Sequence, residues 1–182
     1  MELFYPQEEK TNETSKNEPV LPDNINQRNN LPEAEKGDLI LKPKPRQNSK
    51  EVLTFIETPL YKLLLSSVGG GTVKEFYVKE YLNNDSLPVN IINQNLGFQN
   101  LSLNLKDLDG EKINLSTSWV PGDKNQFIEV KSEHLLEYFL EVSPGKQIRK
   151  SFLFNPDNYS INIKINSQEI KNIVHRDMVF NW

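Results

Sequence analysis

Two histidines, His134 and His175, are the side chains of this sequence best suited to acid–base chemistry or metal binding at neutral pH. A metal site needs two or more ligands that converge, and neither histidine has a second histidine three or four residues away. Both lie among polar residues. We therefore interpret them as separate surface side chains and predict no metal site.

Carboxylates are the next candidates, because a suitably spaced pair can act as general acid and general base. Their spacing is typical of solvated strand faces and turns, and nothing in the sequence selects one pair. The hydroxyl residues form no G-x-S-x-G turn, and a chain without cysteine has neither a thiolate nucleophile nor a zinc–thiolate site. We predict no catalytic residue and no cofactor. The acidic residues considered are Glu75, Glu80, Asp107, Asp109, Glu129, Glu137 and Glu141.

Three consecutive glycines, Gly69, Gly70 and Gly71, could cradle a phosphate if they joined a strand to the start of a helix. The residues that follow, Thr72–Leu82, are instead typical of a strand, and no Lys-Ser/Thr pair stands in the P-loop position. We interpret the glycines as a turn or bulge with positive φ.

The elements that would position these residues are strands. Apolar and polar residues alternate along 101–105 and 159–165, as in an antiparallel sheet with one buried face. Asp109-Gly110 predicts a hairpin to a strand with Ile113 and Leu115, and Ser143-Pro144-Gly145 predicts another. Segment 135–140 also fits a helical stripe, but we favour a strand. The remaining predicted strands are 52–56, 60–66, 72–82, 127–131, 138–142 and 148–154.

Residues 1–50 differ in composition from the rest. They are rich in Asn, Glu, Lys and Pro, and we predict a disordered tether that ends in the cationic, proline-rich segment 42–46. Residues 51–182 form the predicted all-β antiparallel sandwich. The net charge of −4 gives no basic field for nucleic acid, and no apolar run is long enough to span a bilayer.

Two blocks of this sequence resemble the periplasmic domain of the bacterial membrane protein insertase YidC, of the YidC/Oxa/Alb family. The first is 57–82, ETPLYKLLLSSVGGGTVKEFYVKEYL, and the second is 146–154, KQIRKSFLF, followed by Tyr159-Ser160-Ile161. Their order and spacing agree with the family across about residues 51–182. The resemblance implies a β-supersandwich like that of galactose mutarotase, facing the periplasm of a Gram-negative bacterium.

The resemblance also implies a parent protein of the inner membrane that inserts and folds other membrane proteins, alone or beside the Sec translocon. Its partners would be Sec components and nascent membrane proteins. The family's membrane helices and its functional intramembrane arginine have no counterpart here, so we expect an N-terminal fragment. The sandwich would then be incomplete at its C-terminus, with Asn181-Trp182 starting a later strand.

Two other functions remain open. A carbohydrate-binding or mutarotase-like sandwich would place His134 or His175 opposite a glutamate across one cleft. A scaffold or adhesin-like sandwich would present an exposed strand edge or apolar patch to a partner. An incomplete sandwich would expose such an edge too, so an edge alone does not separate a scaffold from the insertase domain.

Overall fold

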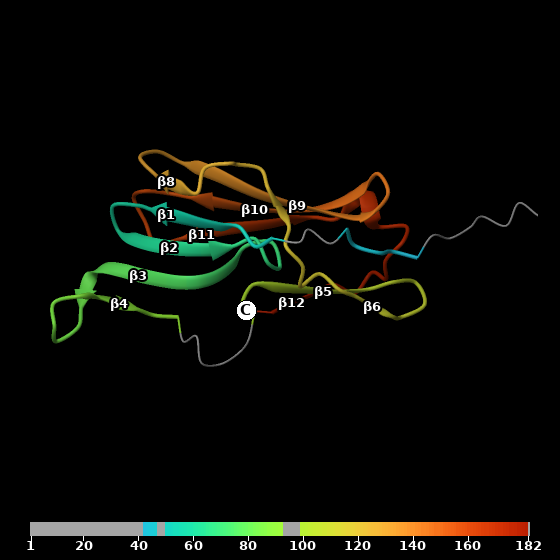
Figure 1. The fold of residues 1–182 in the computed structure, drawn as a ribbon, viewed down its shortest axis with the longest axis horizontal. Helices are drawn as coiled ribbons and strands as arrows, with labels where there is room; N and C mark the ends of the chain where they lie inside the picture. Colours follow the sequence, from blue (N-terminus) through green and yellow to red (C-terminus); the bar gives the residue numbers. More distant parts are fainter. Residues whose placement is uncertain (1–41, 47–49, 93–98, 182) are drawn as a thin grey trace, which may run out of the picture. The chain divides into compact units, whose positions relative to one another are not determined.

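The computed structural model describes residues 42–46, 50–92 and 99–181, all of which belong to one compact unit, Leu39–Trp182. The described fold is all-β, as predicted (Figure 1). Its elements are β1 (Leu53–Glu57), β2 (Tyr61–Ser66), β3 (Thr72–Leu82), β4 (Pro88–Asn90), β5 (Ser102–Lys106), β6 (Lys112–Ile113), β7 (Val120–Pro121), β8 (Phe127–Glu129), β9 (His134–Ser143), β10 (Lys146–Phe154), β11 (Ile161–Asn166), the 3₁₀ helix η2 (Gln168–Ile170) and β12 (Val179–Asn181).

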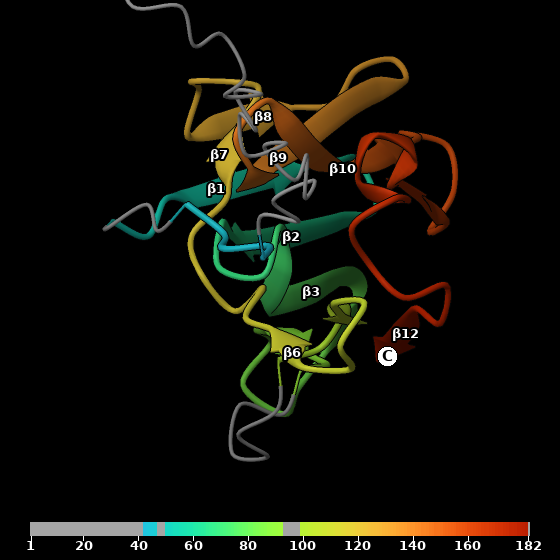
Figure 2. The ribbon, with the colours of Figure 1, turned by 90° about the vertical axis from the view of Figure 1, so that its right-hand side faces the viewer.

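Two sheets form the sandwich. One has the order β4-β3-β2-β1-β8 and the other β11-β10-β9-β7. A third, small sheet has the order β12-β5-β6. Figure 2 shows β1, β2 and β3 following one another within the first sheet. Among the described strands every named pair is antiparallel except β1 with β8.

Most predicted strands are confirmed. The bounds of β3 agree with the prediction, and β9 is a strand that pairs with β10 along its length, so the helical alternative for 135–140 is wrong. Three strands are at least two residues shorter than predicted at one end: β6 ends at Ile113, β8 ends at Glu129, and β11 begins only at Ile161. Asn181, which was expected to start a later strand, is the last residue of β12, and β12 pairs with β5.

The predicted tether lies outside the described residues, apart from 42–46 and Lys50. Within 42–46, the Lys42 Nζ atom lies 3.0 Å from a carboxylate oxygen of Asp109. The backbone N–H of Arg46 donates to the Glu141 carbonyl at 2.9 Å. The end of the predicted tether therefore contacts the sandwich, and the domain boundary at residue 50 stays a prediction. The described residues include no helix of the length and apolarity that a membrane crossing requires.

The core lies between the facing sheets. The inward side chains of β9 and β10 are almost inaccessible to solvent, because a second sheet covers them. These side chains are Leu136, Tyr138, Leu140, Val142, Ile148, Phe152 and Phe154. Trp119 joins this core, and its indole N–H donates to the Leu115 carbonyl at 3.0 Å. The described residues of the two sheets also line a cavity.

Candidate functional site: an apolar groove above a buried lysine

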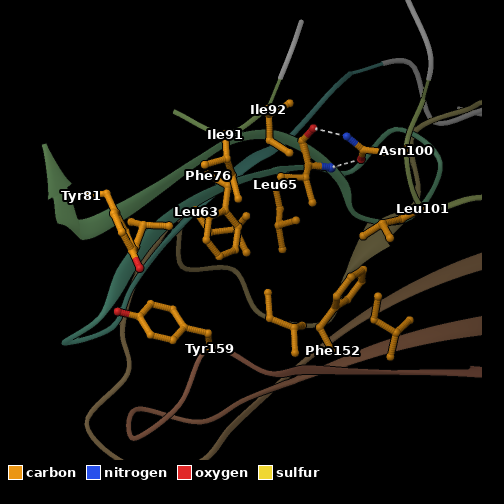
Figure 3. A pocket seen from close by; sticks show the side chains of 14 residues that line it. Leu63, Leu65, Phe76, Tyr81, Ile91, Ile92, Asn100, Leu101, Phe152 and Tyr159 are labelled. Carbon is orange, nitrogen blue, oxygen red and sulfur yellow. Dashed lines mark hydrogen bonds between the residues drawn. The ribbon is translucent and has the colours of Figure 1, made fainter. Parts of the chain in front are cut away.

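An apolar groove of about 560 Å³ opens between the two sheets. Leu63 of β2 and Phe76 of β3 line one wall, and Phe152 of β10 lines the other (Figure 3). Ile163 of β11 lines the groove as well. No described residue that lines the groove carries a charge, and Asn100 is the lining residue with an amide. Such a surface suits an uncharged, apolar occupant and disfavours a phosphate or a carboxylate.

The groove is open because β11 is the last strand of its sheet. The inward residues Ile161, Ile163 and Ile165 were predicted to be buried, but each is only half-buried. Tyr159, predicted to belong to the same buried face, precedes the strand and is 42% exposed. A buried face requires a second layer over it as well as alternation along the strand, and at β11 that layer ends.

Two tyrosines stand at the mouth of the groove. Figure 3 shows the hydroxyl ends of Tyr81 and Tyr159 turned toward one another. The Tyr159 ring lies 6.3 Å from that of Tyr61, which stacks on Phe76 at 4.9 Å. Partial burial raises the pKa of Tyr159, and a hydrogen bond to Glu80 raises it further. The mouth is therefore polar only at its rim.

Asn100 fixes one end of the groove. Its amide oxygen accepts from the backbone N–H of Val73 at 2.8 Å, and its amide nitrogen donates to the Val73 carbonyl at 3.0 Å. Leu101, the next residue, has a φ of 54°, which is unusual for a residue with a branched side chain. The two hydrogen bonds of Asn100 thus attach the start of β5 to β3.

Lys150 lies beneath the groove with 0% of its surface exposed. Its ammonium group donates to the Leu101 carbonyl and, at 3.4 Å, to the Gly69 carbonyl. The Phe152 and Phe180 rings lie 5.3 and 5.7 Å from its Nζ atom. Burial lowers the pKa of Lys150 from 10.5 to about 7, and among the described residues no carboxylate forms an ion pair with it.

The sequence reasoning missed the burial of Lys150. The residue lies two positions from Ile148 and from Phe152 on β10, so strand alternation directs its side chain inward. That alternation was the available signal. The position of Lys150 explains how Leu101 is held at positive φ, because the carbonyl of Leu101 accepts a hydrogen bond from the buried Lys150 Nζ atom.

The glycine turn, residues 69–71, lies beside Lys150, whose Nζ atom donates to the Gly69 carbonyl. We call Lys150 and this turn the floor of the groove. Gly69, Gly70 and Gly71 have φ values of 67°, 69° and 98°, which confirms the predicted positive-φ turn. Their N–H groups donate to the carbonyls of Thr117, Ser67 and Ser66 at 3.0–3.1 Å, so none is free for a phosphate. A Cβ atom on Gly70 would lie 2.6 Å from the Trp119 ring, and one on Gly71 would overlap Phe152.

The histidines lie far from a shared site. His134 Nε2 is 3.9 Å from a carboxylate oxygen of Asp123, and His175 Nδ1 is 3.2 Å from one of Asp177. Within residues 42–46, 50–92 and 99–181, no three metal-binding side chains cluster.

Asp123 borders a second cavity, lined also by Glu137. His134 Nε2 and the Asp123 carboxylate are only 3.9 Å apart, so no sugar ring fits between them as a mutarotase-like mechanism requires. Glu137 accepts from the Ser151 hydroxyl at 2.9 Å and lies 3.7 Å from Arg149. Glu137, the glutamate that borders this cavity, is therefore already bound to Ser151 and paired with Arg149.

Asp107 illustrates the structural role of the acidic residues. It is buried, and its Oδ1 accepts from the N–H groups of Asp109 and Glu111 at 3.0 and 2.8 Å. These bonds build the predicted hairpin between β5 and β6, in which Gly110 has a φ of 86°. The carboxylate is thus used to form a turn.

Comparison with known proteins agrees with this geometry. A family model described as the YidC periplasmic domain matches residues 54–174, which include all residues that line the groove. A search of curated proteins finds no match. The match spans both sheets, the glycine turn and Lys150. Since it covers more than half of the sequence, the chain belongs to the family of YidC periplasmic domains.

Proposed function

We propose that this chain is the non-enzymatic periplasmic part of an inner-membrane insertase, where it assists the insertion and folding of other membrane proteins. Membership of the YidC periplasmic domain family supports the association with an insertase. The single structural observation that carries the proposal further is the uncharged groove, which suits apolar protein segments better than polar metabolites. Partners would be nascent membrane proteins, with or without components of the Sec translocon.

The domain would act by position and surface. A sandwich near the membrane can hold an emerging apolar segment away from water before that segment enters the bilayer. Asn100 and Lys150 would keep the groove open by bracing its end and its floor, since both bind backbone carbonyls of neighbouring elements. No bond is made or broken in this role.

Site-specific photo-crosslinking tests the proposal. A photoreactive phenylalanine analogue at Tyr159 lies at the mouth of the groove, and the same analogue at Leu135 lies on the outer face of β9, where the side chain is 55% exposed. In the native host, adducts with nascent inner-membrane proteins should form from position 159 and be scarce from position 135. Equal adducts from both positions, or none from either, would contradict the proposed role of the groove.

A further inference from the structure

Residues 42–46, Lys-Pro-Lys-Pro-Arg, precede the first strand, and we call them the strap. Both prolines are half-buried, whereas the cations Lys42, Lys44 and Arg46 are exposed. Burial therefore alternates along the strap, and the prolines form its more covered side. Because a proline ring fixes φ, the strap has little backbone freedom to lose when it lies against the sandwich.

One end of the strap contacts the β5–β6 hairpin. The Lys42 Nζ atom lies 3.0 Å from a carboxylate oxygen of Asp109. This hydrogen bond raises the pKa of Lys42, and the negative charges of the same hairpin raise it further. Those charges are carried by Asp109, Asp107 and Glu111. The turn is fixed in turn by the Asp109 N–H, which donates to Asp107 at 3.0 Å, so the strap meets acidic side chains that are already in place.

The other end of the strap contacts the β9–β10 hairpin. The backbone N–H of Arg46 donates to the Glu141 carbonyl at 2.9 Å, and the Arg46 Nη1 atom lies 3.7 Å from Oε2 of the same residue. The other carboxylate oxygen of Glu141 accepts from the Gly145 N–H at 2.9 Å, which orients the carboxylate. The strap thus joins a hairpin of the small sheet to a hairpin of the sheet β11-β10-β9-β7.

These contacts place the strap but hold it loosely. Both ion pairs join exposed side chains, and such pairs contribute little to stability and are screened by salt. The next described anchor along the chain is Lys50, whose carbonyl accepts from the Ser118 hydroxyl at 2.8 Å. Release of the strap would free the chain from residue 42 up to Lys50, a length of up to about 28 Å when extended.

We propose that the strap is a releasable electrostatic catch that sets the length of the link between this domain and the membrane. The docked strap ends that link at Lys42, and its release moves the end to Lys50. The membrane at the far end of the link rests on the proposed function, whereas docking and release of the strap do not. The strap lies outside residues 54–174, so the family match does not account for it.

Limited digestion with trypsin reports the docked state, because the protease needs an extended, free chain on both sides of the bond that it cuts. Proline follows both lysines of the strap and blocks cleavage there, so the cleavable bond is Arg46-Gln47. The double variant Asp109→Asn/Glu141→Gln removes both ion pairs and keeps the carbonyl of residue 141. Mass spectrometry should show cleavage of this bond about fivefold faster than in the wild type.

The double variant Glu129→Gln/Glu133→Gln is the matched control. It changes the net charge by the same amount, both carboxylates are exposed, and their described partners are Lys131 and Asn155. Cleavage after Arg46 should proceed in it at the wild-type rate. In 1 M NaCl, where the Debye length is about 3 Å, the wild type should approach the rate of the strap variant. Equal cleavage of the two double variants at low salt would overturn the proposal.

A nitroxide label on Lys44→Cys measures docking without a protease, since the chain has no other cysteine. Its electron paramagnetic resonance spectrum should contain a slow component that shrinks in the Asp109→Asn/Glu141→Gln background and in 1 M NaCl. A fully mobile label on the otherwise wild-type chain would show that the strap does not dock. A slow component that neither treatment changes would show docking without electrostatic control, which also overturns the proposal. Failure of the proposed insertase role would leave both measurements unchanged.

Discussion

The closed core and the mouth of the groove are made of the same residue types but differ in how they are covered. In the core, Phe152 and Ile148 are almost inaccessible to solvent, and Gly71 of the glycine turn packs against the Phe152 ring. At the mouth, Ile161 and Ile163 follow the same alternation and stay half-exposed. The difference shows that burial here is decided by whether a second layer is present, and not by the pattern along a strand.

The largest loss of stability should come from adding a methyl group to the glycine turn at Gly71. Gly71→Ala adds a methyl group against Phe152 at a φ of 98°, so overpacking and backbone strain act together. We expect a loss of about 4 kcal/mol in the free energy of unfolding, measured by urea titration. Gly110→Ala is the control, because its φ is 86° and no atom lies within 4 Å of the added methyl group. A similar loss in both variants would show that packing at Gly71 is unimportant.

The comparison can be tested directly with one substitution on either side. Ile148→Ala removes a side chain that is 0% exposed and should lower the free energy of unfolding by about 3 kcal/mol. Ile161→Ala removes a half-buried side chain and should cost about 1 kcal/mol in dilute protein. Equal losses in urea titrations would mean that the mouth of the groove is as well covered as the closed core.

Lys150 makes the stability of the floor depend on pH. Its pKa is about 7 in the fold and 10.5 ordinarily, so between these values the unfolded chain holds a proton that the folded chain has released. Unfolding then takes up a proton, and stability rises with pH by up to about 1.4 kcal/mol per pH unit. Lys150→Met should lack this rise in urea titrations from pH 7 to 10. A rise of the same slope in both proteins would contradict the burial of the ammonium group.

The smallest effect concerns the brace at the end of the groove. Asn100→Ala removes two hydrogen bonds to Val73 and should lower the free energy of unfolding by about 1 kcal/mol. The fluorescence of an apolar dye bound to the groove should change as well. Asn104→Ala, on the outer face of β5, should change neither quantity. Equal dye fluorescence in the two variants would show that Asn100 does not shape the groove.

Much of the fold could be predicted from the sequence. Period-2 alternation located most of the strands, and glycine identified the turn at residues 69–71, because these signals are local. The two motif blocks placed the chain in a family that a match over residues 54–174 confirms.

The groove was not predicted, because it depends on contacts between residues far apart in the chain. Alternation shows which side of a strand faces inward, but Ile161 is only half-buried because of where its sheet ends. Lys150 was overlooked for a related reason. Its neighbours Ile148 and Phe152 indicate an inward direction, yet lysine is rarely buried without a charged partner, and its acceptors are backbone carbonyls that no motif reveals.

The contacts of Lys150 also constrain the order in which the chain can fold. Its hydrogen bonds reach back 49 residues to Leu101 and 81 residues to Gly69. Long-range closures of this kind form slowly, because the intervening chain must first be ordered. A chain that emerges N-terminus first therefore carries β1–β3 with their apolar side uncovered until residue 150 arrives.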